Sequence, residues 1–201
     1  MLMALLLMRR RSLLVLGMGL IGTALRPTPA RAAAAGEHLQ VFRPQLAPLP
    51  SVALTTMQGQ ARLLDRELVA DVPLVLNFIF TTCSSTCSVQ TAMLAQVQHD
   101  LAARGRRVQL ASITIDPDND TPEQLRRFTQ HFSIGAGWQF YTGRFDDLLR
   151  VQRHFDVYRG SKAAHPPVLL MRRHARAPWL RVEGFPAAGE LVALIESLPA
   201  A

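Results

Sequence analysis

The sequence predicts an α/β domain with a central mixed β-sheet flanked by helices. Segment 74–80 is a run of mostly apolar residues, the pattern of a strand buried on both faces. Shortly after it, apolar residues recur at helical spacing from Val89 to Leu101, and Arg104 and Gly105 then mark a helix end. A strand that leads into a helix, followed by further strand and helix patterns, is typical of this fold class.

The remaining elements follow in the order of a thioredoxin-like sheet with insertions. Segment 52–64 predicts a small hairpin, an N-terminal extension that precedes the main sheet. Thr121 predicts a helix from Pro122 to about Phe132, because threonine caps helices, proline suits the first position and Gln124 completes a capping box. The other predicted elements are strands at 107–115, 138–141, 167–171 and 179–182, the last two antiparallel, and helices at 145–155 and 190–198.

Residues 1–34 have the layout of a signal peptide. Three arginines, 9–11, precede an apolar stretch at 13–25 that is short for a transmembrane span of about 20 residues, and small residues follow at 30–34. The pair Arg10 and Arg11, followed by Ser12, Leu13 and Leu14, also resembles a twin-arginine signal. We expect cleavage near Ala32 or Ala34, and hence an exported, periplasmic protein; an uncleaved segment would tether it to the outer face of the inner membrane. A proline-punctuated linker at 35–50 would then lead to the thioredoxin-like domain at 51–201.

The charge of the chain gives no indication of a nucleic-acid partner. The formal net charge is +7, but five of the 22 basic residues precede Ala32, where no acidic residue lies. The remainder therefore carries 17 basic residues against 15 acidic ones, without a basic patch interleaved with aromatic residues. We expect no nucleic-acid binding, and membrane contact only through an uncleaved N-terminal segment.

The only two cysteines, Cys83 and Cys87, lie between the central strand and its helix at C-x-x-x-C spacing. Residues four apart share one face of a helix, so the two sulfurs can meet each other or share a third partner. Because a helix N-terminus favours anions, we expect at least one thiol to have a lowered pKa. A structural disulfide, a redox pair and a soft-metal site all remain open, although a disulfide across so short a loop would add only about 2 kcal/mol.

Three segments together resemble the Sco/SenC family, whose thioredoxin-fold members deliver copper to cytochrome oxidase. They are 80–87 with both cysteines, 112–122 with its D-P-D-N-D-T-P run, and His165 ahead of a late strand. The resemblance covers the chain from about Ser51 onward. It implies that Cys83, Cys87 and His165 bind one copper ion per chain, as Cu(I) or Cu(II).

The chain departs from the family pattern beside each of these three residues. The family usually has proline after each cysteine, whereas this chain has Ser84 and Ser88. Pro166 and Pro167 follow the histidine, where a small hydroxyl residue is more usual. Serine restores a backbone donor that proline lacks, so the flexibility and redox potential of the cysteine loop can differ from the family's.

The chemistry of these residue types agrees with copper. Two thiolates and an imidazole make a soft, low-coordinate site, whereas zinc normally takes a fourth ligand. His154 is the alternative histidine ligand. The thioether sulfurs of Met57, Met93 and Met171 are further candidate donors. Helical spacing favours a core role for Met93.

Asp116 and Asp120 lie in the loop after strand 107–115. The D-P-D-N-D run resembles a hard-cation loop, but the glycine and the late glutamate of a calcium site are missing. We therefore expect these carboxylates mainly to cap and order the loop. Because a strand end in this fold lies near the cysteine loop, Asp116 is also a candidate to support the site or to contact a partner.

These observations support two main functional hypotheses. The first is a metallochaperone, a carrier rather than a true enzyme, that passes copper to the copper-binding subunit of a respiratory cytochrome oxidase; copper donors or thiol reductant proteins would be further partners. The alternative is an exported thiol–disulfide oxidoreductase that uses the redox pair Cys83 and Cys87 without copper. A peroxidase is a weaker hypothesis, because threonine or serine is expected three residues before the attacking cysteine, and here Phe80 holds that position.

Overall fold

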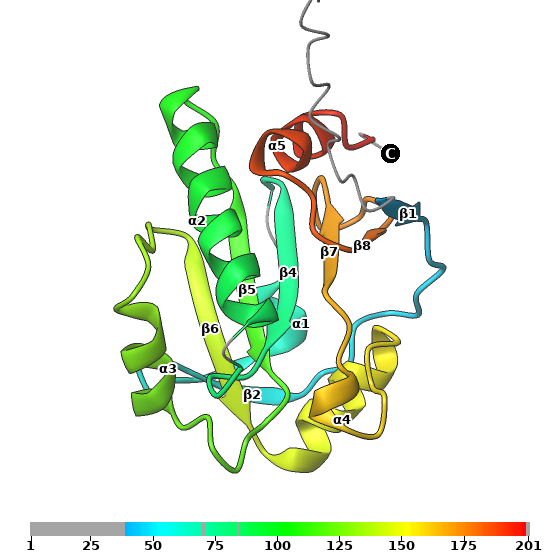
Figure 1. The fold of residues 1–201 in the computed structure, drawn as a ribbon. Helices are drawn as coiled ribbons and strands as arrows, with labels where there is room; N and C mark the ends of the chain where they lie inside the picture. The colour runs from blue at the N-terminus through cyan, green and yellow to red at the C-terminus, as the bar shows by residue number, and fades with distance from the viewer. Residues whose placement is uncertain (1–38, 70, 84, 200–201) are drawn as a thin grey trace, which may run out of the picture. The chain divides into compact units, whose positions relative to one another are not determined.

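The computed structural model describes residues 39–69, 71–83 and 85–199, so the predicted signal peptide lies outside the described residues. Within these ranges the strands form an eight-stranded mixed sheet in the order β1-β8-β7-β4-β5-β6-β2-β3 (Figure 1). The strands are β1 (Gln40–Phe42), β2 (Ala53–Thr56), β3 (Ala61–Leu63), β4 (Leu74–Ile79), β5 (Gln109–Thr114), β6 (Trp138–Gly143), β7 (Val168–Arg172) and β8 (Leu180–Glu183).

Strand β4 lies in the middle of the sheet, parallel to β5 and antiparallel to β7. All six of its residues are buried. Val75 and Ile79 pack into the core on one face, while Leu76 and Phe78 pack into the core on the other, which explains the run of apolar residues. Because β5 runs parallel and β7 antiparallel to β4, the ends of β4 and β5 and the start of β7 meet at one edge of the sheet.

Helices cover both faces of the sheet (Figure 1). One core contains residues of α2 (Thr86–Ala103), α3 (Pro122–Thr129) and α5 (Ala188–Glu196). The other contains residues of α1 (Leu64–Glu67) and α4 (Phe145–His154). A short 3-10 helix, η1 (Lys162–Ala164), precedes β7. In the described part of the chain, no helix is long and apolar enough to cross a membrane.

The predicted α/β class, the central strand and the helix after it are confirmed. The cap on α3 is also confirmed, because Gln124 N donates to Thr121 Oγ1 at 3.3 Å, although α3 ends at Thr129 rather than Phe132. The predicted hairpin is β2 and β3, but it does not stand apart: β2 pairs with β6, so the hairpin forms one end of the main sheet. Strand β1 lies within the segment predicted as linker and pairs with β8.

A buried polar network fixes the first turns of α2 on the sheet. Asn77 Nδ2 donates to Gln90 Oε1 at 2.9 Å, and Ser112 Oγ donates to Asn77 Oδ1 at 2.6 Å. Trp138 Nε1 completes the network by donating to Ser112 Oγ at 2.9 Å. Gln90 lies one turn after Cys87, so the network that joins β4, β5 and β6 to α2 also sets the position of the cysteine-bearing turn.

Candidate metal and thiol site

The cysteines lie where the sequence places them, around the start of α2. Cys83 precedes the helix and is half-buried, whereas Cys87 lies in the first turn and is 2% exposed. Both are free thiols, and the backbone N–H of Cys87 donates to Cys83 Sγ at 3.3 Å. Ser88, at a position where the resemblance predicts proline, donates its hydroxyl to the Cys83 carbonyl at 3.3 Å. At the start of α2, the Cys83 sulfur therefore accepts a backbone hydrogen bond, whereas Cys87 is buried.

The two thiols differ in pKa because they differ in depth and in hydrogen bonding. Burial raises the pKa of Cys83, but hydrogen bonds from Cys87 and Ser85 outweigh it, so the pKa of Cys83 is lowered overall. Burial raises the pKa of Cys87 to about 12, with the neighbouring Cys83 and the charge of Asp120 adding to the rise. The expectation of one lowered thiol pKa is thus confirmed, and the thiol concerned is the more exposed one.

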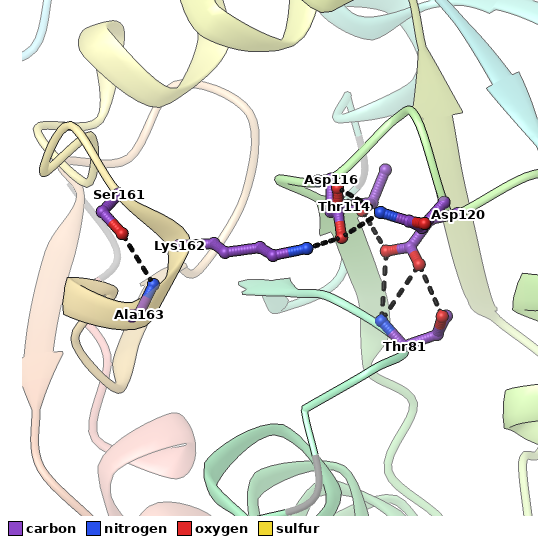
Figure 2. Close-up of polar contacts among 8 residues, drawn as sticks. Thr81, Thr114, Asp116, Asp120, Ser161, Lys162 and Ala163 are labelled. Atoms are coloured by element: carbon purple, nitrogen blue, oxygen red, sulfur yellow. Dashed lines mark hydrogen bonds and ion pairs between the residues drawn. The ribbon is translucent and has the colours of Figure 1, made fainter.

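Asp120 joins the cysteine loop to the end of β5. It is fully buried and accepts hydrogen bonds from Thr81 N at 3.1 Å and from Thr81 Oγ1 at 2.5 Å (Figure 2). The hydroxyl of Thr114 also donates to Asp120. Burial raises the pKa of Asp120, and the hydrogen bonds from Thr114 and Thr81 oppose this rise. Of the two aspartates, Asp120 therefore contacts the cysteine loop directly.

Asp116 instead connects the same loop to the segment that carries His165. Its Oδ2 lies 2.5 Å from Lys162 Nζ (Figure 2). Asn119 Nδ2 donates to both of its carboxylate oxygens at 3.0 Å. The Asp116 side chain is 9% exposed. Its role in supporting the site remains a prediction, but the structure gives it a defined partner.

His165 lies at the start of the turn into β7, at the same edge of the sheet as the cysteine loop. Its Nε2 is 3.3 Å from the Phe78 carbonyl oxygen, and its ring packs edge-on against Phe78. Its Nδ1 is buried, with no hydrogen-bond partner in the described ranges. Burial lowers the pKa of His165, and the nearby backbones of Phe78 and Val157 oppose this only in part. The imidazole is therefore held in its neutral form, the form that binds metals.

The structure brings the two cysteines together but not His165 with them. Cys83 opens into a hollow with Phe128, His131 and Phe132, whereas His165 lines a different hollow beside Lys162. Within the described ranges, no three His, Cys, Asp or Glu residues form a group that could hold a metal ion. In this arrangement the imidazole of His165 is therefore not grouped with the two sulfurs.

The alternative donors lie elsewhere. His154 ends α4 and packs its ring against Phe155 at 4.7 Å, on the face of the sheet opposite to Cys87. Met171 is fully buried in the core, and Met57 and Met93 pack against that core. None of them lines the hollow that contains Cys83.

Sequence reasoning missed Thr81, His131 and Lys162. Thr81 could have been found from the rule that parallel strands end at one edge, which places it opposite the loop after β5. Lys162 is the only lysine in a chain with 21 arginines and lies three residues before His165, which is a visible signal. No sequence signal places His131, which lies just after α3, in the hollow of Cys83.

Together, the fold and these residues define a thioredoxin-like protein that carries a dithiol at a helix start and a histidine at the same sheet edge. The chain matches the SCO1/SenC family model over residues 52–175, and it belongs to that family. The resemblance found in the sequence is therefore confirmed.

Individual relatives agree with this assignment. The SCO1 protein homolog of Bacillus subtilis (strain 168) is 32% identical over 94 residues, which are 46% of this chain and 42% of that protein, so the match spans less than half of the relative. The structure of BsSco, described as a cytochrome c oxidase assembly protein with a disulfide switch, is 20% identical with a TM-score of 0.64, covering 78% of this chain and 95% of that one. Copper-bound ScoI of Arabidopsis thaliana is 19% identical with a TM-score of 0.63, covering 75% and 97%. At these identities the two structures establish the shared fold.

Proposed function

We propose that this protein is a copper metallochaperone that binds one copper ion through Cys83, Cys87 and His165. The observation that carries the proposal is a half-exposed thiol of lowered pKa and a second thiol, with a neutral imidazole across the same sheet edge. Two sulfurs and one imidazole suit Cu(I), and they can also hold Cu(II). Family membership supports the proposal, as do the copper-bound structure of Arabidopsis ScoI and the description of BsSco as an oxidase assembly protein.

The two thiols would act in a fixed order. Cys83 is the more exposed and the more readily ionised, so incoming copper meets its sulfur first. Cys87 keeps its proton at neutral pH because its pKa is about 12, and it would release that proton only as its sulfur coordinates the metal. His165 would bind last, because its ring lines a different hollow from Cys83 and has to approach the sulfurs. Transfer would run through the exposed Cys83, by ligand exchange with the copper-binding subunit of a respiratory cytochrome oxidase.

Anaerobic Cu(I) titration of the reduced protein, against a competing chelator, tests this proposal. We expect one copper per chain, and an affinity at least about tenfold lower for His165→Ala, because the third ligand is lost. His99→Ala is the matched control, because His99 is exposed and pairs only locally with Asp100, at 3.4 Å. Equal affinities for wild type and His165→Ala would show that the ligand set is wrong.

The difference between the thiols also supports the second candidate function, thiol–disulfide exchange. The Cys83 thiolate would attack a partner disulfide, forming a mixed disulfide and releasing one partner thiolate. Cys87 would then lose its proton and attack Cys83 Sγ, so that the pair becomes a disulfide and the partner's second thiol is freed. A thiol reductant protein would supply the two electrons that regenerate the pair.

A trapping experiment tests this second candidate. Cys87→Ser should accumulate a mixed disulfide with a disulfide-containing model peptide, because no thiol remains to resolve it. His165→Ala should leave exchange largely intact, so the two functions can be separated. If Cys83→Ser accumulates the adduct instead, the assigned order of attack is wrong.

We also propose that the protein acts outside the cytoplasm. The signal-peptide pattern of residues 1–34 supports export to the periplasm, and an uncleaved segment would keep the domain at the outer face of the inner membrane.

A further inference from the structure

Lys162 connects the segment that carries His165 to the rest of the site. Its Nζ lies 2.5 Å from Asp116 Oδ2 (Figure 2). The same atom lies 5.7 Å from the centre of the ring of Phe80, which is three residues before Cys83. Asp116 is held in turn by Asn119. The Lys162 cation thus lies between an almost buried carboxylate and an aromatic ring, a setting that screens it less than open solvent would.

The turn that follows transmits this anchor to His165. Lys162 is the first residue of η1, which Ser161 caps by accepting a hydrogen bond from Ala163 N at 3.2 Å. The backbone N–H of His165 donates to the Lys162 carbonyl at 3.2 Å. This hydrogen bond couples the position of the His165 backbone to that of Lys162. In this position the imidazole lies against the Phe78 carbonyl, in a different hollow from Cys83.

We propose that Lys162 is a positioning residue, whose ion pair with Asp116 holds His165 on the Phe78 carbonyl and away from the thiols. This inference rests on the proposed copper site, and it adds that the ion pair regulates how readily His165 joins the two cysteines as the third ligand. An interaction that stabilises only the metal-free arrangement lowers the apparent affinity for the ion, because it lowers the population of the competent arrangement. Breaking the ion pair should therefore tighten copper binding, whereas removing His165 should weaken it.

The metal-free protein provides the first test. In Lys162→Met, backbone amide hydrogen exchange at Ala163 and His165 should rise about threefold, the effect expected from losing one partly exposed ion pair. Lys162→Arg should restore the wild-type rates, because it keeps the charge. The matched control is Arg159→Met, which removes a different cation from the same loop. Arg159 forms its ion pair with Asp156, at 3.2 Å, within that loop. Because Lys162 is the only lysine, its side-chain NMR signal also reports directly on the pair, and it should shift in Asp116→Asn.

Copper titration provides the second test. Lys162→Met should bind Cu(I) about threefold more tightly than wild type, and the double variant with Asp116→Asn should add nothing further, because both changes break one pair. Unchanged amide exchange in Lys162→Met, or copper binding that is unchanged or weaker, would overturn the positioning role. Wild-type affinity in His165→Ala would instead overturn the copper ligand set, while the exchange rates would still decide whether Lys162 positions His165.

Discussion

At the scale of single residues, Cys83 and Cys87 show how depth determines the chemistry of two identical side chains. The more exposed sulfur accepts a backbone hydrogen bond at the helix start, while the buried one is 2% exposed and has a pKa raised to about 12. Thiolate is the reactive form, so the two positions should differ in rate as well as in ionisation.

Alkylation by iodoacetamide should distinguish them. In Cys87→Ser the remaining thiol keeps its backbone donor, so it should react at a rate that levels off at a lower pH than for a free cysteine. In Cys83→Ser the remaining thiol should react at least about tenfold more slowly near pH 8, because it is buried and protonated. Mass spectrometry of timed samples measures both rates, and similar rates in the two variants would contradict the difference in depth.

Asp120 predicts an unusual dependence of stability on pH. Burial raises its pKa from the ordinary value of 3.8, so the native state holds this proton more tightly than the unfolded state does. Its stabilising contribution is therefore complete below 3.8 and is lost as the pH rises through the native pKa. We expect the free energy of unfolding of wild type, relative to Asp120→Asn, to fall as the pH increases over this interval.

Urea unfolding at a series of pH values measures this difference. Asp118→Asn changes the same net charge at an exposed position of the same loop, so it is the control. A relative stability that rises with pH would contradict the raised pKa of Asp120.

At the scale of elements, α2 buries polar side chains as well as apolar ones. Gln90 is 2% exposed and accepts a hydrogen bond from the side-chain amide of Asn77. Gln96, on the same helix, is exposed and donates a hydrogen bond to Asp100. We expect Gln90→Ala to lower the free energy of unfolding by about 2 kcal/mol, because the buried Nδ2 of Asn77 loses its acceptor. Gln96→Ala should stay within about 0.5 kcal/mol of wild type. Denaturant unfolding measures both, and equal losses would mean that the network does not stabilise α2.

The same helix shows which features the sequence could predict and which it could not. Its existence and end follow from apolar spacing and from Gly105, which adopts φ +67° directly after the helix. The buried face of the helix does not follow from apolar spacing, because Val89 is 57% exposed while Gln90 and Thr91 are buried. Hydrophobicity cannot reveal a face whose first turns bury polar side chains. Strand β1 was missed for a related reason: its three residues are all exposed, and only pairing with β8 makes them a strand.

The site was predictable to the extent that it depends on local sequence. The lowered thiol pKa follows from a cysteine beside a helix start. The pairing of Lys162 with Asp116 depends on segments 46 residues apart that only the sheet brings together. The location of His165 on the Phe78 carbonyl depends likewise on the register of β7 beside β4, which residue types do not specify.

At the scale of the whole molecule, the N-terminal segment should decide where the protein works. Expression of the complete chain in a Gram-negative host should give a mature protein that begins after Ala32 or Ala34, because small residues there suit signal peptidase. N-terminal sequencing of the periplasmic fraction measures this. A membrane fraction that retains residue 1 would show instead that the segment is an anchor.

The antiparallel pairing of β7 with β4 also has a consequence for biogenesis. Cys83 and Cys87 lie near the middle of the chain, whereas His165 shortly precedes β7, a later strand that pairs with β4. If the chain is exported N-terminus first as an unfolded polypeptide, it would present both thiols to an oxidising compartment before its imidazole arrives. Until β7 docks, those sulfurs would be open to premature oxidation, and the proposed copper site would lack its histidine. Tight copper binding through the three proposed ligands would therefore require a completely folded molecule.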